Sequence, residues 1–211
     1  AYGGERPLWL IASEYAIVPV NHVTYPNRML RQAGLLRLQR TETGEQLDFE
    51  ASSAWTLVDH QAAHVFVQRE ADLGRVADVF RHAEGIDEVL VGEQRSRYRL
   101  DHPRSGEIIL ISSPNSWMAY YWWLDDHLAP SFARTVDIHR KPGYDPVELQ
   151  WDPATRTIPL DASLVRGSHG APARTEAQRG VFLTSERGLV EQTSLADTDL
   201  CRIILRNFGL D

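Results

Sequence analysis

The sequence predicts an α/β protein whose main sheet is interrupted by a small α+β subdomain. Residues 7–12 form a continuous apolar run of strand length, as expected of a strand buried on both faces of a parallel sheet. Residues 180–184 form a second apolar strand, and residues 197–207 an amphipathic helix that Gly209 ends. We expect three segments: core α/β domain over 1–50, inserted subdomain over 51–115, and an aromatic and loop-rich region returning to the core domain over 116–211.

Two short elements follow the first strand. Pro26 stands at the start of a segment of helix length and Gly34 just past its end, which are the usual places of these residues at helix termini. Residues 35–40 alternate between apolar and polar side chains. They predict a strand that ends in a turn at residues 42–45.

The inserted subdomain has its own pattern. Residues 71–82 carry apolar side chains at the spacing of a helix face. Strand-like segments flank this helix at residues 55–58, 64–67, 86–91 and 107–112. Strands and a helix within so short a stretch indicate a small α+β unit of ferredoxin-like character.

Residues 116–123 are dense in aromatic side chains. They could stack on a nucleobase or an aryl leaving group, but large aromatic residues at this density are more typical of a core. Residues 124–161, rich in Asp, Pro and Gly, predict a long ordered loop region, and such loops are often functional.

Composition excludes some classes of partner. The formal charge of -7 and the pI near 5.6 argue against a nucleic-acid groove or an anionic membrane surface. The single cysteine, Cys201, permits no internal disulfide and lies in an apolar run that predicts a buried thiol. The chain has no apolar stretch of membrane-spanning length and no visible export signal. Lys141 is the only lysine, and we expect a bacterial, cytoplasmic protein.

The apolar strand within residues 10–17 ends in Ser13-Glu14-Tyr15. It resembles a strand of the alkaline phosphatase superfamily, in the type I phosphodiesterase and nucleotide pyrophosphatase branch, that ends in Ser-Asp-His-Gly. In that family the Asp and the His bind one of two zinc ions. The resemblance makes Glu14 a metal ligand and places Tyr15 at the histidine, where a phenol, a poorer zinc ligand than imidazole, would line the site. The alternative is a polar strand end on a surface turn.

Residues 164–172 contain Gly-Ser-His169-Gly and resemble the family's late Gly-x-His-Gly segment, whose histidine completes the other metal site. The resemblance makes His169 a ligand, and its glycine neighbour would let backbone and metal approach closely. A solvated loop histidine is the alternative. The tail resembles the family's closing strand and helix, with a packing role in which Asp197 or Asp199 is the helix N-cap.

Two further clusters stand apart from the resemblance. Read as an extended strand, residues 59–64 place His60 and His64 on one face, where they could share a metal. Histidines bonded to backbone are the favoured interpretation, because a core strand follows. The second cluster is a basic loop patch of His139, Arg140 and Lys141, whose side chains could bind phosphate oxygens. The alternative is a solvated loop whose basic side chains form ion pairs.

The family's nucleophile, a Thr or Ser beside a metal-binding Asp, and its Asp-x-x-x-His pair precede the Ser-Asp-His strand, and nothing before Ser13 fits them. No nucleophile elbow, Walker loop or dinucleotide fingerprint is present either. The resemblance therefore implies the C-terminal part of an alkaline-phosphatase-like sheet, inactive without the missing N-terminal half. The intact enzyme would hold two metal ions, zinc foremost, and hydrolyse a phosphate ester such as a nucleotide.

That missing half, or a second copy, would cover the exposed sheet. A non-catalytic binding or scaffold member of the same fold is the rival reading. A sulfatase-like or phosphomutase-like relative is a third, because a superfamily fold does not fix its reaction.

Overall fold

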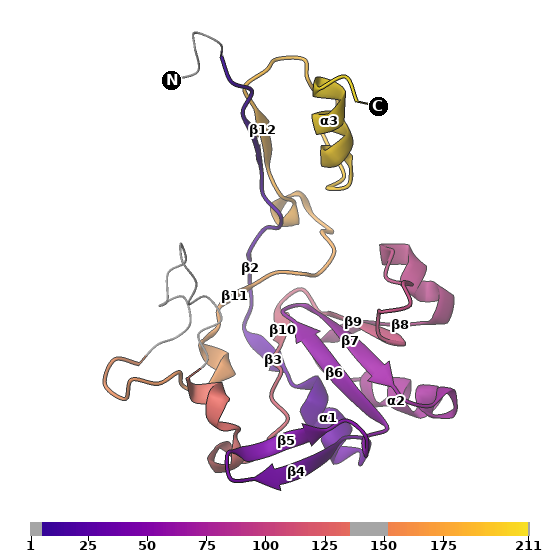
Figure 1. Ribbon diagram of the computed structural model, residues 1–211, viewed down its shortest axis with the longest axis vertical. Helices are drawn as coiled ribbons and strands as arrows, with labels where there is room; N and C mark the ends of the chain where they lie inside the picture. Colours follow the sequence, from indigo (N-terminus) through magenta and orange to yellow (C-terminus); the bar gives the residue numbers. More distant parts are fainter. Residues whose placement is uncertain (1–5, 136–151, 211) are drawn as a thin grey trace. The chain divides into compact units, whose positions relative to one another are not determined.

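The structure is a computed structural model that describes residues 6–135 and 152–210 (Figure 1). Internal contacts divide the chain into two compact units. Unit 1 consists of Ala1–Ala16 and Ala173–Asp211, and unit 2 is Ile17–Pro172. Within the described ranges, no helix combines the length and apolar character needed to cross a membrane.

The main sheet of unit 2 has four strands. They are β6 (Ala54–Asp59), β7 (Ala62–Val67), β8 (Ile86–Val91) and β9 (Ile108–Ser112), antiparallel throughout in the order β6-β7-β9-β8. Helix α2 (Leu73–Phe80) connects β7 to β8. The strands and the helix predicted for the inserted subdomain are all present, while its ferredoxin-like character stays a prediction.

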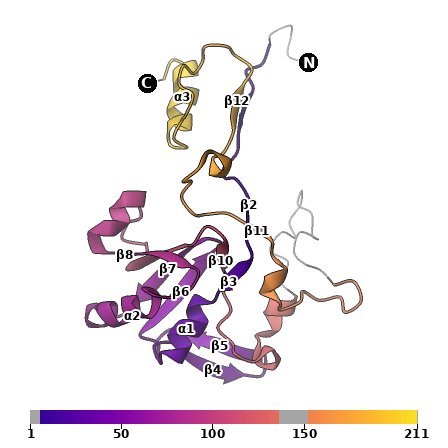
Figure 2. The same ribbon diagram turned by 180° about the vertical axis from the view of Figure 1, so that it is seen from behind.

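Both faces of this sheet bury apolar side chains. On one face, α2 packs Val76 and Phe80 into a core that also holds Val65 of β7, all three fully buried. On the other, Ile109 and Ile111 of β9 form a smaller cluster. Helices α1 (Pro26–Gln32) and α2 lie side by side against the sheet (Figure 2). Strand β9 is buried along its whole length, which explains its continuous apolar sequence.

The rest of unit 2 consists of short ladders and helical turns. Strands β2 and β11 pair antiparallel, β3 and β10 pair parallel, and β4 and β5 form a hairpin. The predicted helix begins at Pro26, and Gly34 follows it with a positive φ of 71°. The bounds are β2 (Val18–Pro19), β3 (His22–Thr24), α1 (Pro26–Gln32), β4 (Arg37–Thr41), β5 (Gly44–Asp48), β10 (Ser116–Met118) and β11 (Gly167–Ser168), with 3-10 turns η1 (Glu70–Asp72), η2 (Gly92–Tyr98), η3 (Asp126–Leu128), η4 (Ser131–Arg134) and η5 (Ala162–Leu164).

Unit 1 pairs β1 (Leu10–Ala12) with β12 (Phe182–Thr184) and adds η6 (Glu176–Gln178) and α3 (Asp199–Asn207). The expectation of a strand buried in a parallel sheet is wrong for β1, which pairs antiparallel and is largely exposed. In the part of the chain that the structure describes, β12 is its single neighbour. A two-stranded ribbon with one helix is too small to bury both of its faces.

The C-terminal helix brings two further corrections. Cys201 is exposed rather than buried, because α3 buries none of its residues. The residue at the N-cap is Thr198, not either aspartate. Asp199 lies in the first turn, where its Oδ2 accepts a hydrogen bond from the backbone N–H of Ala196 at 3.1 Å.

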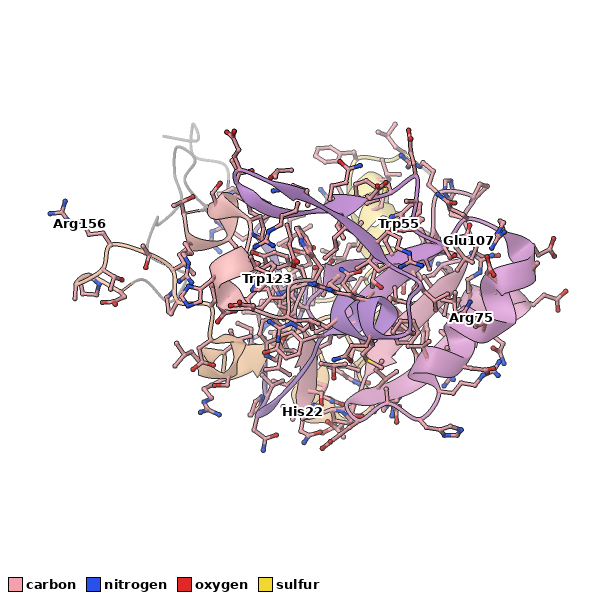
Figure 3. The ribbon with its side chains drawn as sticks, turned by 90° about the horizontal axis from the view of Figure 1, so that it is seen from below. His22, Trp55, Arg75, Glu107, Trp123 and Arg156 are labelled. Atoms are coloured by element: carbon pink, nitrogen blue, oxygen red, sulfur yellow. The ribbon has the colours of Figure 1, made fainter. Side chains whose placement is uncertain are left out.

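The aromatic segment after β10 is core, as favoured from its density. Trp123 is fully buried, and its ring stacks on that of Tyr121 with centroids 4.3 Å apart. The indole N–H of Trp122 donates to the backbone oxygen of Glu45 at 2.9 Å. Figure 3 shows Trp123 within the crowded interior of unit 2, whereas Arg156 lies at the tip of a projecting loop. These aromatic side chains are therefore engaged in packing.

The buried phenols make stability depend on alkaline pH. Burial raises the pKa of Tyr25, Tyr120 and Tyr121, so these side chains stay neutral in the folded chain beyond the pH at which they ionise when unfolded. We expect the free energy of unfolding to fall as pH rises above about 10, because only the unfolded state then releases their protons. Urea unfolding curves recorded across this pH range measure the free energy of unfolding. Tyr121→Phe should flatten the decline, because it removes one of these groups. A decline as steep in Tyr121→Phe as in the wild type would contradict this account.

Candidate functional site

His169 follows strand β11 in unit 2. Strand β11 pairs with β2, Ser168 lying opposite Val18. The backbone oxygen of His169 accepts a hydrogen bond from the backbone N–H of Gln61 at 2.9 Å. The segment is thus fixed by backbone contacts to the turn that joins β6 to β7 (Figure 1).

That turn corrects the interpretation of residues 59–64. They are not one extended strand, because His60 and Gln61 form the two-residue turn of the β6–β7 hairpin, closed by the Asp59–Ala62 pair. His60 has a φ of +56°, and a positive φ at the first central residue is typical of type II′ turns. His60 and His64 therefore do not lie on one strand face.

The turn instead brings His60 to His169. The centroids of the two imidazole rings are 4.1 Å apart, and the ring planes are tilted by 41°. Gly170, which follows His169, has a φ of +106°, a backbone conformation that favours glycine. The carboxylate of Asp59 lies 3.7 Å from Nε2 of His60. Two imidazoles thus meet at the hairpin tip, and a carboxylate lies near one of them.

His64 has a structural environment, as favoured from the sequence. Its Nδ1 accepts a hydrogen bond from the backbone N–H of Gly106 at 3.2 Å, and its ring stacks on Phe66. Burial lowers the pKa of His64, which favours the neutral ring that this bond requires.

Glu14 and Tyr15 belong to unit 1. The strand end before them is fixed by Ser13, whose backbone N–H donates to the backbone oxygen of Val181 at 2.9 Å. The Ser13 hydroxyl in turn accepts from the N–H of Val181 at 2.6 Å. Both Glu14 and Tyr15 are exposed just beyond this anchor. The two metal ligands expected from the sequence, Glu14 and His169, therefore lie in different units.

The basic patch of His139, Arg140 and Lys141 lies outside the described residues. Its role in binding phosphate oxygens stays a prediction.

The neighbouring imidazoles of His60 and His169 fit part of a zinc shell, since neutral imidazole nitrogen is a preferred zinc ligand. A tight zinc site needs three or four protein ligands. Residues 6–135 and 152–210 hold no group of three or more His, Cys, Asp or Glu side chains arranged for a metal ion. The pair would thus be one part of a site that other groups complete.

Contacts between distant residues were not predictable from the motifs. Nδ1 of His22 lies 2.8 Å from the hydroxyl of Ser116, and its Nε2 lies 3.8 Å from a carboxylate oxygen of Glu84. The order Ser, His, Glu is that of a catalytic triad, but Ser116 is only 1% exposed and cannot meet a substrate. This contact is structural. The His60–His169 pair was missed for the same reason, and the one local signal was a histidine in a turn.

A family model described as type I phosphodiesterase / nucleotide pyrophosphatase matches residues 7–145, a range that includes Glu14 and ends before His169. No curated protein matched the chain.

Two solved structures resemble it, both of phosphonoacetate hydrolase from Sinorhizobium meliloti 1021. The complex with phosphonoformate is 14% identical, with a TM-score of 0.45, over 84% of this chain and 35% of that one. The complex with phosphonoacetate is 18% identical, with a TM-score of 0.39, over 58% of this chain and 30% of that one. The chain thus spans about a third of the length of these structures. Because the family model matches most of its residues, the chain belongs to the type I phosphodiesterase / nucleotide pyrophosphatase family.

Proposed function

We propose that the protein is a metal-dependent hydrolase that transfers phosphoryl groups from a phosphodiester or pyrophosphate, with a nucleotide as the expected substrate class. The observation that carries the proposal is the family match over residues 7–145. The placement of His169 supports it, because the segment after β11 is fixed by its backbone and presents an imidazole beside a second one.

His169 would donate a ring nitrogen to one metal, and Glu14 a carboxylate oxygen to the other. When bound, zinc in such sites lowers the pKa of a nucleophile and stabilises the leaving oxygen. Tyr15 would line the cleft, and His139, Arg140 and Lys141 would pair with phosphate oxygens. No motif in the 211 residues supplies a nucleophile, so turnover is expected of the complete protein and not of this chain by itself.

A second candidate function is favoured by one observation. Tyr15 stands where the family motif has a histidine, and a neutral phenol is a poor zinc ligand. A member that lost one metal site could bind phosphate esters without hydrolysing them, or act as a scaffold on the same fold. A sulfatase-like or phosphomutase-like reaction is the third reading.

Metal analysis of the complete protein tests the ligand assignment. In Glu14→Ala and in His169→Ala, zinc content should fall from about two ions per chain to about one, because each variant removes a ligand of a different site. Tyr15→Phe, the matched control, should keep both ions, since it removes only a hydroxyl. Unimpaired zinc in both alanine variants would show that neither residue is a ligand. About one zinc ion per wild-type chain, without hydrolysis of any phosphodiester, would favour the binding member.

A further inference from the structure

We infer that His60 is a second imidazole ligand for the metal bound by His169, so that the subdomain containing β6 and β7 contributes directly to the metal site. The inference rests on the proposed function of His169 and extends it to a residue that the family motif does not include.

The first step is the contact itself. A zinc-bound imidazole nitrogen lies about 2.0–2.1 Å from the ion, so two rings that share one ion must be neighbours. The ring centroids of His60 and His169 are 4.1 Å apart, and they come from strand ends far apart in the sequence. Both residues belong to unit 2, so their proximity is a property of one compact unit.

The second step is rigidity. The backbone oxygen of His60 accepts from the N–H of Met118 at 2.7 Å, and Gln61 donates its backbone N–H to His169 at 2.9 Å. The Gln61 side chain is 2% exposed and donates from Nε2 to the backbone oxygen of Ser116 at 2.9 Å. The turn is therefore held to β10 and to the segment after β11 at once. Ligands held in place by their backbone lose little freedom when a metal binds.

The third step is the backbone conformation of His60. Its φ of +56° lies in the left-handed region, where glycine is favoured and other residues cost on the order of 1 kcal/mol. A type II′ turn takes glycine at this position by default. The imidazole is thus present at a place that the turn alone would give to glycine, which suggests a role for the side chain.

The fourth step concerns the neighbouring charge. A carboxylate beside a ligating imidazole helps to orient its ring. Asp59 lies near His60, with Oδ1 3.7 Å from Nε2, which is beyond hydrogen-bond distance. The His60 side chain is 47% exposed and His169 is partly exposed, so a metal ion has access to both rings.

The positive φ of His60 allows a variant that removes the ring without an expected loss of stability. His60→Gly removes the imidazole and relieves the positive φ, so it should leave the free energy of unfolding equal or higher. Arg99→Gly is the matched control, because Arg99 is exposed and has a nearly identical φ of +58°. Zinc alone is titrated into the 211-residue chain, with affinity measured by calorimetry and the imidazole nitrogens followed by ¹⁵N NMR.

We expect the ring signals of His60 and His169 to shift at the same zinc concentrations. His60→Gly should weaken zinc binding by at least about tenfold, whereas Arg99→Gly should not change it. If His169→Ala weakens binding and His60→Gly does not, the inference fails and the proposed function stands. If neither variant changes binding, the role of His169 falls as well. A wild-type chain that binds no zinc at millimolar concentration would also overturn the inference, and the test on the complete protein would still decide the role of His169.

Discussion

Replacing Trp123 with alanine is expected to lower the free energy of unfolding by about 3–5 kcal/mol, the range for removing a large buried aromatic side chain. Trp123 is fully buried and packs its ring on Tyr121, Trp122 and Tyr120. Its indole N–H also donates to Oδ1 of Asp126 at 3.0 Å, so the variant loses a hydrogen bond as well as packing. Urea unfolding followed by circular dichroism measures the change.

The control for this variant is Trp9→Ala. Trp9 is 58% exposed in unit 1, and its truncation should change the free energy of unfolding by no more than about 0.5 kcal/mol. A cost for Trp123→Ala as small as that of the control would show that the aromatic segment is not core, and would reopen its reading as a stacking surface for a nucleobase.

Glu45→Gln is the second variant with a large expected effect. Glu45 is 8% exposed, and its two carboxylate oxygens accept from Arg31 at 2.6 and 2.9 Å. The same guanidinium donates to the backbone oxygen of Trp122 at 3.1 Å, so the ion pair fixes the aromatic segment to α1 and β5. The neutral amide keeps the shape but leaves a mostly buried charge without its counterion, at a cost of about 3 kcal/mol.

A matched exposed pair isolates the contribution of burial. Arg81 and Asp78 form an ion pair three residues apart on the surface, where Asp78→Asn should cost at most about 1 kcal/mol. Chemical denaturation of the two variants side by side measures the difference. Equal costs for Glu45→Gln and Asp78→Asn would contradict the view that this ion pair anchors the aromatic core.

The elements of the inserted subdomain could be predicted because their signals are local. The helix face within residues 71–82 and the strand-length apolar runs on either side depend only on spacing along the chain. The two ends of α1 could also be predicted, from Pro26 and Gly34, because proline favours the first turn of a helix and glycine the positive φ just after its end.

The predictions that are wrong concern burial and turns, which depend on neighbours that residue spacing along the chain does not encode. An apolar run looks the same in the sequence whether its strand is buried in a parallel sheet or exposed in a ribbon, as β1 is here. For the same reason, the apolar run around Cys201 wrongly predicts a buried thiol. Residues 59–64 looked extended because no glycine marks the turn at His60.

The candidate site divides in the same way. His169 is predicted as a ligand from a local motif with glycine beside it, whereas its proximity to His60 arises from how the β6–β7 turn meets the segment after β11. Spacing along the chain does not encode that contact.

The most direct test of the central claim is zinc X-ray absorption on the complete protein, wild type against His169→Ala. We predict imidazole scattering from nitrogen at about 2.0–2.1 Å in the wild type, weaker in the variant as one ligand is lost. Identical spectra from the two proteins, or a wild-type spectrum without imidazole scattering, would show that His169 does not bind the metal.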